Sequence, residues 1–198
     1  MLAGDRESAA PFRVAFVPGV TLDRWSRIWD ERMREIPLQL LPIDEAEQTA
    51  VLRAGRAEMS FVRPPIERRA VELIPLYSEV PVVVVPTGHP ITAYDEITAA
   101  DLAGEQLIRV PPATYAEAIL DVAGGRGVVV VPMSVARLHH RKDLTSRPVT
   151  DIPETQIGLA WLAGTADPRI EQFIGIVRGR TSRSSRGGET PRGRRSRR

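Results

Sequence analysis

The sequence predicts an α/β fold, because short β-rich segments alternate with segments whose apolar residues recur at helical spacing. The runs FRVAFV (12–17), LQLLPI (38–43) and MSFVRPP (59–65) are such β-rich segments, and helical patterns at 21–36 and 44–57 separate them. Repeated β-α-β order predicts a parallel sheet with helices on its faces. With 198 residues and 42% hydrophobic content, the chain is large enough for one domain or for two small lobes.

The first of these repeats carries the clearest local signals. The strand is closed by Pro18-Gly19, and apolar side chains then recur at helical spacing. Thr21 is expected to cap the helix, because its hydroxyl can accept a hydrogen bond from a free N–H of the first turn. Trp25 and Trp29 could form an aromatic binding surface, but their spacing favours a stripe that faces the core.

The remaining chain continues the alternation. An apolar strand at 80–85 is followed by a turn at 87–90, and Thr98 or Asp101 is expected to cap a short helix. Gly124-Gly125 is expected to end a helix. The other predicted elements are that helix at 116–125, a strand at 127–132, a helix start at 134–140, strands at 144–151 and 155–163, and an amphipathic helix at 168–180.

Residue content and spacing argue against an enzyme, a metal site and a cofactor. The chain has no cysteine, so disulfides, thiolate ligands and a cysteine nucleophile are excluded. His89 lies in a Gly-His-Pro turn, and His139 and His140 are adjacent, so the i, i+4 spacing of paired metal ligands is missing. The glycine-rich residues 124–127 precede a strand and lack the lysine and hydroxyl of a phosphate loop. No serine stands in a nucleophile elbow.

The amino terminus and the hydropathy pattern bear on location. Charged residues stand where a signal peptide needs an apolar segment, and no apolar run reaches the length that spans a bilayer. We therefore expect a cytoplasmic protein without membrane contacts.

Basic charge is concentrated at the C-terminal end. Nine of the 27 basic residues and one of the 25 acidic residues lie at 178–198, which leaves residues 1–177 with 18 basic and 24 acidic side chains and a net charge of −6. Without large apolar side chains, this tail is predicted to be disordered. Arginines in such an arm pair with phosphates and release counterions, which predicts nucleic-acid binding. The candidate nucleic-acid-binding residues are Arg178, Arg180, Arg183, Arg186, Arg192, Gly193, Arg194, Arg195, Arg197 and Arg198.

One part of the tail has a more specific pattern. Residues 191–194 read Pro-Arg-Gly-Arg, which resembles the core of the AT-hook, whose arginines lie in the narrow minor groove of A·T-rich DNA. Arg195 stands where the usual core has its second proline. Two alternatives stay open, namely sequence-independent binding to DNA or RNA and an arm that only solubilises the protein or contacts its acidic body.

The order of segments also points to a known family. The stretches PFRVAFVPGVTLDRW, LIPLYSEVPVVVVPTGHPI, ITAADLAGEQLI and IGLAWLAGTADPRIEQFIGIVR resemble the effector-binding domain of LysR-type transcriptional regulators. The resemblance implies a two-lobed fold like that of type 2 periplasmic-binding proteins, with a small molecule, often an organic acid or aromatic metabolite, bound between the lobes. It covers residues 12–177 as an effector-binding-like domain, which leaves a flexible N-terminus at 1–11 and the disordered arginine-rich tail at 178–198 on either side.

The chain departs from the family pattern in two places. The sensor-like strand begins at Phe12, where a LysR-type regulator normally begins with a winged helix-turn-helix, so the usual DNA reader is expected to be missing. Only RVPPATY (109–115) stands where the family has a further strand and helix. We therefore expect a shortened second lobe.

Candidate ligand-binding residues follow from the predicted sheet. In open α/β folds, ligands bind at the carboxyl ends of the strands, close to helix N-termini. Arg63 could pair bidentately with a carboxylate, unless it is only an arginine at the rim. Asp44 and Glu45 would repel an anionic ligand, although a solvated helix start is the commoner role of such acids. The selected residues are Pro18, Gly19, Val20 and Thr21 after the first strand, and Arg63 and Pro64 after the third.

Two functional hypotheses result. The first is a small-molecule sensor associated with transcription regulation that binds nucleic acid, most simply DNA, through its tail. The second is a ligand-binding or protein-interaction module that forms homodimers, or heterodimers with full-length LysR-type regulators, without binding DNA itself. They differ in whether residues 178–198 are required for nucleic-acid binding.

Overall fold

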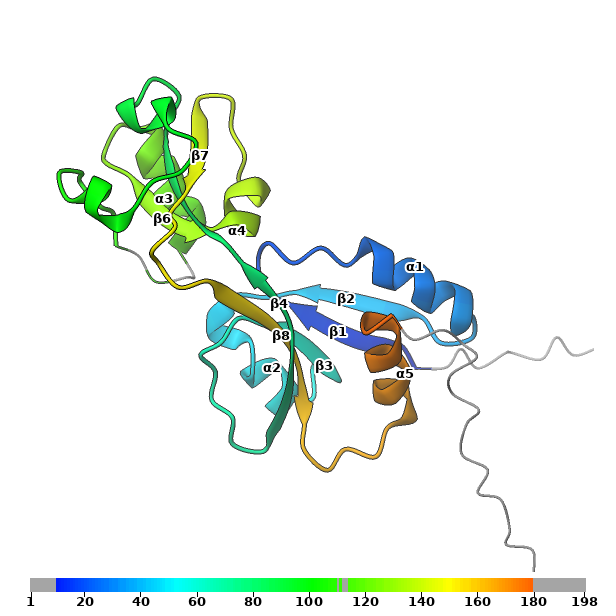
Figure 1. Ribbon diagram of the computed structural model, residues 1–198. Helices are drawn as coiled ribbons and strands as arrows, with labels where there is room; N and C mark the ends of the chain where they lie inside the picture. Colours follow the sequence, from blue (N-terminus) through cyan, green and yellow to red (C-terminus); the bar gives the residue numbers. More distant parts are fainter. Residues whose placement is uncertain (1–9, 110, 112–113, 180–198) are drawn as a thin grey trace, which may run out of the picture.

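Two α/β lobes joined by a pair of crossing strands make up the protein (Figure 1). The computed structural model describes residues 10–109, 111 and 114–179. The first lobe has a five-stranded sheet and the second a three-stranded sheet, and the predicted two-lobed α/β fold is confirmed. The elements are β1 (Phe12–Phe16), α1 (Asp23–Arg32), β2 (Leu38–Pro42), the 3₁₀ helix η1 (Glu45–Glu47), α2 (Ala50–Arg53), β3 (Met59–Val62), β4 (Val71–Glu79), β5 (Pro81–Pro86), the 3₁₀ helices η2 (Pro90–Ala93) and η3 (Ala99–Leu102), α3 (Tyr115–Ala123), β6 (Val129–Pro132), α4 (Met133–Leu138), β7 (Leu144–Pro148), β8 (Thr155–Leu162) and α5 (Pro168–Val177).

The first sheet combines parallel and antiparallel strands in the order β2-β1-β3-β8-β4. Strands β2, β1 and β3 are parallel, as their β-α-β connections predict. Strand β8 is antiparallel to both β3 and β4. The carboxyl ends of β1, β2 and β3 therefore meet at one edge of the sheet, and the second lobe lies beyond this edge (Figure 1).

Helices α1 and α5 cover one face of this sheet, and α2 packs on the other face. Trp29 is fully buried, and its ring stacks on Phe12 with 4.8 Å between ring centroids. Trp25 stacks on Phe61 at 5.0 Å. The two tryptophans thus belong to the core, as their helical spacing predicts, and do not form an exposed binding surface.

The sheet of the second lobe is antiparallel, in the order β6-β5-β7, so the expectation of parallel strands is wrong here. Val82 and Val84 face the helices α3 and α4, whereas Val83 and Val85 face the segment that contains η2 and η3. A strand that is buried on both faces reads as an unbroken apolar run whatever the direction of its neighbours. For this reason the sequence alone does not reveal the strand direction.

The crossing strand β4 has no counterpart among the predicted elements. It contains Pro75, which cannot donate a ladder hydrogen bond, and its outward side chains are polar. The ladder with β8 shifts register between Pro75 and Tyr77, so the proline lies at an irregularity where the missing donor is tolerated. The strand carries the chain to the second lobe (Figure 1). Glu79 at its end bonds Ser134 of that lobe and so lies at the junction of the two lobes.

The single helix predicted within residues 44–57 is wrong in its continuity, although α2 ends close to the predicted stop near Gly55. The structure has the short helices η1 and α2 there. The Gln48 side chain bonds both backbone groups of Arg63, with Oε1 accepting from the N–H at 2.8 Å and Nε2 donating to the carbonyl at 3.2 Å. Contacts of this kind draw polar side chains inward and override the helical pattern.

Two predicted helix signals are confirmed. Thr98 and Asp101 form a reciprocal capping box at the start of η3, in which the Thr98 N–H donates to Asp101 Oδ2 at 2.8 Å. Helix α3 ends at Ala123, and Gly125 adopts a φ of +73° directly after it. None of the helices in the described ranges is long and apolar enough to cross a membrane.

Candidate functional site

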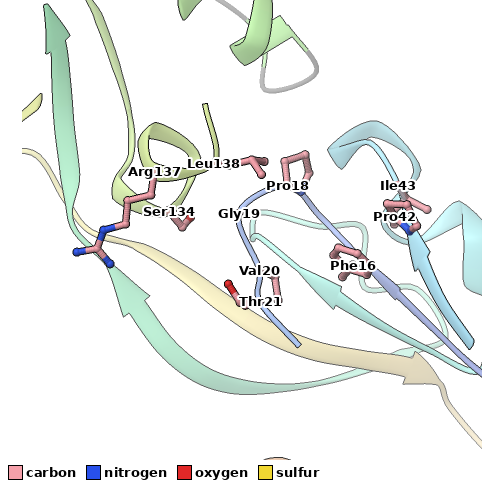
Figure 2. Close-up of a pocket in the computed structure, with 10 residues that line it drawn as sticks. All are labelled: Phe16, Pro18, Gly19, Val20, Thr21, Pro42, Ile43, Ser134, Arg137 and Leu138. Carbon is pink, nitrogen blue, oxygen red and sulfur yellow. The ribbon is translucent and has the colours of Figure 1, made fainter. Parts of the chain in front are cut away.

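The loop after β1 faces α4 of the second lobe across a cavity of about 500 Å³. Four of the six predicted ligand-binding residues, Pro18 to Thr21, line it. Figure 2 shows Ser134 and Leu138 of α4 close to this loop, and Phe16 and Pro42 further along the wall. Residues of both lobes therefore enclose this part of the cleft.

Gly19 is a point at which the loop closely approaches the second lobe. Its φ is +90°, and a Cβ atom there would lie 2.9 Å from Ser134 Cβ and 3.0 Å from the Ser134 carbonyl carbon. Only glycine has both the backbone freedom and the small size for this contact. The predicted turn at Pro18-Gly19 is thus also an interlobe contact.

Thr21 does not have the predicted capping role. Helix α1 begins at Asp23, its N-cap residue is Leu22, and no side chain bonds the free N–H groups of the first turn. Leu22 is buried in the core, and the helix begins one residue later than it would with Thr21 as its N-cap. Thr21 is exposed at the wall of the cavity.

The other two predicted residues, Arg63 and Pro64, line a second cavity of about 380 Å³. This cavity also has walls from both lobes, since Glu45 belongs to η1 in the first lobe and Tyr115 to α3 in the second. The six residues selected from the sequence are therefore all at the interlobe cleft, but the structure divides them between two cavities.

Arg63 is not an arginine at the rim. Its side chain is 3% exposed and forms ion pairs with two carboxylates. Nε donates to Glu79 Oε2 at 2.8 Å, one terminal nitrogen bonds Glu45 Oε1, and the other donates to the Pro18 carbonyl at 3.0 Å. We call Arg63, Glu45 and Glu79 the buried ion cluster. The expectation that Glu45 is a solvated residue at a helix start is consequently wrong.

The buried ion cluster forms the wall between the two cavities. Glu79 accepts hydrogen bonds from Ser134 Oγ, which lines the first cavity, and from Thr155 Oγ1, which lines the second, at 3.4 Å. Ser134 belongs to the second lobe, so its bond to Glu79 also joins α4 to the crossing strand β4. A change in either cavity can therefore act on the same carboxylate.

Burial and fixed charges perturb the titratable groups around the cluster. Burial raises the pKa of Glu45 above its ordinary value, against the opposing effect of Arg63. Burial, followed by the charge of Glu79, raises the pKa of Tyr77 to about 12. Burial and the charge of Glu45 raise the pKa of Tyr115, so both phenols are neutral hydrogen-bonding groups at physiological pH.

His89 lies apart from the adjacent His139 and His140, since it lines a different cavity. His89 Nε2 lies 3.2 Å from Glu105 Oε2, and its Nδ1 accepts from the Ile91 N–H. Within residues 10–109 and 114–179, no group of three or more histidine and carboxylate side chains is arranged to hold a metal ion.

Most of the predicted nucleic-acid-binding tail lies outside the described residues. Arg178 is described, and its N–H donates to the Ile174 carbonyl at 2.9 Å at the end of α5. The other predicted positions, from Arg180 to Arg198, are not.

Sequence reasoning missed several groups of the cleft. Glu79 was missed because its strand was not predicted, and Gln48 and Tyr115 because nothing in their local pattern separates them from surface residues. Ser134 also follows a strand. Thr21 and Arg63 were selected because ligands bind at the carboxyl ends of parallel strands, and the same rule would have selected Ser134 if the second sheet were parallel.

Comparison with protein families now decides the assignment. The model of the LysR substrate binding domain matches residues 6–122, more than half of the chain. The chain belongs to the LysR substrate-binding-domain family. The resemblance seen in the sequence is thereby confirmed, and so is the expectation that the protein is not an enzyme.

Regulators of known name align with this LysR domain at low identity. The Hca operon transcriptional activator HcaR of Escherichia coli is 23% identical over 198 residues, which cover 84% of this chain and 67% of the relative. AlsR of Bacillus subtilis is 23% identical, with 82% and 64% covered. A probable hydrogen peroxide-inducible genes activator of Mycobacterium avium is 27% identical, with 74% and 51% covered. The aligned region thus spans 51% to 67% of the length of these relatives.

Solved structures show the same fold. The BenM effector-binding domain with its effector benzoate superposes with a TM-score of 0.73 at 20% identity, covering 93% of this chain and 97% of that domain. The OxyR regulatory domain of Pseudomonas aeruginosa gives a TM-score of 0.70 at 24% identity, covering 86% and 97%. At these identities the likeness establishes the fold alone.

The close approach at Gly19 yields a first prediction. Gly19→Ala should lower the free energy of unfolding by about 2–4 kcal/mol, because it adds both backbone strain and a clash with Ser134. Gly55→Ala is the matched control, since Gly55 also has a positive φ of +63° but no atom within 4 Å of its Cβ position. Urea unfolding of both variants measures the difference. Equal losses would show that the interlobe contact at Gly19 contributes nothing.

The buried ion cluster yields a second prediction. Arg63→Met should cost about 3–5 kcal/mol, because it leaves two buried carboxylates without their cation. Arg56→Met, which breaks an exposed pair with Glu47, should cost less than about 1 kcal/mol. In the Arg63→Met variant, the two buried carboxylates bind protons more tightly in the folded state than in the unfolded state. The loss in free energy of unfolding should therefore shrink as the pH falls. Urea unfolding at neutral and acidic pH tests both claims; a deficit that grows in acid would contradict them.

Proposed function

We propose that this LysR domain senses a small-molecule effector that binds in the cleft between its lobes. The observation that carries the proposal is the pair of cavities, of about 500 and 380 Å³, whose walls come from both lobes. Volumes of this size suit small metabolites, and apolar walls with a few fixed polar groups are typical of ligand sites. The BenM domain, which has the same fold, has benzoate as its effector.

The hinge geometry supports a signalling role for such binding. Two crossing strands, β4 and β8, join the lobes, and Ser134 of the second lobe bonds Glu79 at the end of β4. A ligand that contacts both lobes favours the arrangement in which those contacts are made together, and it shifts the population towards that state. The domain is associated with transcription regulation, so we propose that this shift in population carries the effector signal to that process. The signal would act in the cytoplasm, where nucleic acid is accessible.

A thermal-shift screen tests the sensor function. Some compound in a metabolite library should raise the melting temperature, because it binds the folded state alone. The double variant Leu138→Trp/Ala46→Trp, which fills both cavities, should lose the response. Leu120→Trp/Ala50→Trp is the control, since these positions are exposed and line neither cavity. A library without any stabilising compound, or a response that survives filling of the cleft, would overturn the proposal.

We also propose that the arginine-rich tail binds nucleic acid. The support is the charge distribution, with nine arginines and one acid at 178–198 against a net charge of −6 on residues 1–177. Arginines neutralise phosphates and release counterions, whereas phosphates repel the acidic body. The tail follows α5 of the first lobe, and the residues of α5 line neither cavity.

Truncation tests the tail. Removal of residues 180–198, which leaves α5 intact, should abolish gel shifts of duplex DNA or RNA, and binding by the full chain should weaken steeply with salt. Replacement of the tail arginines by lysine should keep charge-driven affinity. The pair Arg192→Lys and Arg194→Lys should lose any preference for A·T-rich duplex if the minor groove is read. If the full chain shifts no nucleic acid even at low salt, the protein-interaction module, paired with itself or with full-length relatives, replaces this proposal.

A further inference from the structure

We infer that the second cavity, lined by Glu45 and Tyr115, selects an organic cation over a carboxylate. The ligand class is an amine, amidine or guanidinium group on an apolar body. The inference rests on the proposed function, because it names the chemical class of effector that one half of the interlobe cleft would take.

The charges of the cavity wall carry the first step. Among the described residues that line this cavity, Arg63 is the one basic residue. It belongs to the buried ion cluster, whose two carboxylates outweigh it, for a formal net charge of −1. All three side chains are at most 7% exposed, so water screens these charges little. An incoming carboxylate would have to displace Glu45 or Glu79 from the guanidinium or lie beside them unpaired.

Glu45 supplies the second step. Its Oε1 bonds Arg63, whereas its Oε2 accepts no hydrogen bond from the described part of the chain. Among the described side chains, the fully buried polar atom without a hydrogen-bond partner is Ser60 Oγ. Glu45 Oε2 therefore keeps some exposure, and Glu45 lines the second cavity. A carboxylate oxygen is an acceptor only, and the N–H groups of a cation are its natural partners.

The remaining walls fit an apolar body attached to that cation. Ala46, Pro64 and Pro65 of the first lobe and Tyr115 of the second line the cavity, and Thr155 adds a hydroxyl. An aromatic ring such as that of Tyr115 also attracts a cation over its face. A ligand held between Glu45 and Tyr115 would contact both lobes at once.

The inference applies to the second cavity alone. Arg137 lines the first cavity, where it is exposed, and Figure 2 shows its guanidinium directed away from the loop at Pro18 to Thr21. None of the described residues that line that half of the cleft has a carboxylate, so the preference for a cation is inferred for the half lined by Glu45 alone.

A matched set of ligands tests the inference. Benzamidine, benzamide and benzoate share one apolar body and differ in charge, and their dissociation constants can be measured by calorimetry at neutral pH on the full chain. Benzamidine should bind at least about tenfold more tightly than benzoate, with benzamide between them, and the ratio should shrink as salt screens the charges. This comparison on the unmodified protein needs no variant to fold.

Variants locate the effect. Glu45→Gln should remove most of the preference for benzamidine, whereas Glu47→Gln, the same change two residues away on the exposed side of η1, should keep it. The inference would be overturned if benzoate bound as tightly as benzamidine or more tightly, or if both variants kept the preference for benzamidine. Neither result would contradict effector binding in the cleft. Absence of benzamidine binding would likewise overturn it; the sensor function itself fails only if the wider library also yields no ligand.

Discussion

The buried ion cluster is the constraint on which the geometry of the cleft depends. Two carboxylates and a guanidinium have been removed from water at the junction of the lobes, and their desolvation is offset only if each group keeps its partners. Arg63 satisfies this condition by reaching Glu45 on η1, Glu79 at the end of β4 and the Pro18 carbonyl after β1. Four segments far apart in the sequence are thereby held around one side chain.

The cluster also accounts for local features that otherwise look irregular. The chain after β2 forms short helices in place of one longer helix because Glu45 and Gln48 face inward to Arg63. The end of β4 is buried although the strand is largely exposed before it, because Glu79 must meet the guanidinium. On the other side of Glu79, Ser134 brings α4 against Gly19. The wall between the cavities and the contact between the lobes are thus parts of one network.

An arginine at the end of a parallel strand is a common way to bind an anion, and the same residue type has a different role here. What decides the role is the partner. Two protein carboxylates already occupy the guanidinium, so the position that would attract an organic acid is electrostatically satisfied from within. Charge is also divided along the chain. Residues 1–177 have a net negative charge, and the arginines suited to a phosphate partner lie beyond α5.

The sequence by itself determined the elements whose signals are local. The β-α-β order, the tryptophan stripe, the capping box at Thr98, the helix end at Gly124-Gly125 and the concentration of arginines after residue 177 follow from spacing and composition. The candidate residues Pro18 to Thr21 and Arg63 could be placed at the cleft because the ends of parallel strands meet at one edge. Only the tertiary structure decided the strand direction in the second lobe, the crossing strand that contains Pro75 and the partners of Arg63. The physical reason is that these features depend on contacts between residues far apart in the sequence. No local pattern distinguishes a buried charge from an exposed one. The same holds for the direction of a strand buried on both faces and for a proline that a strand tolerates.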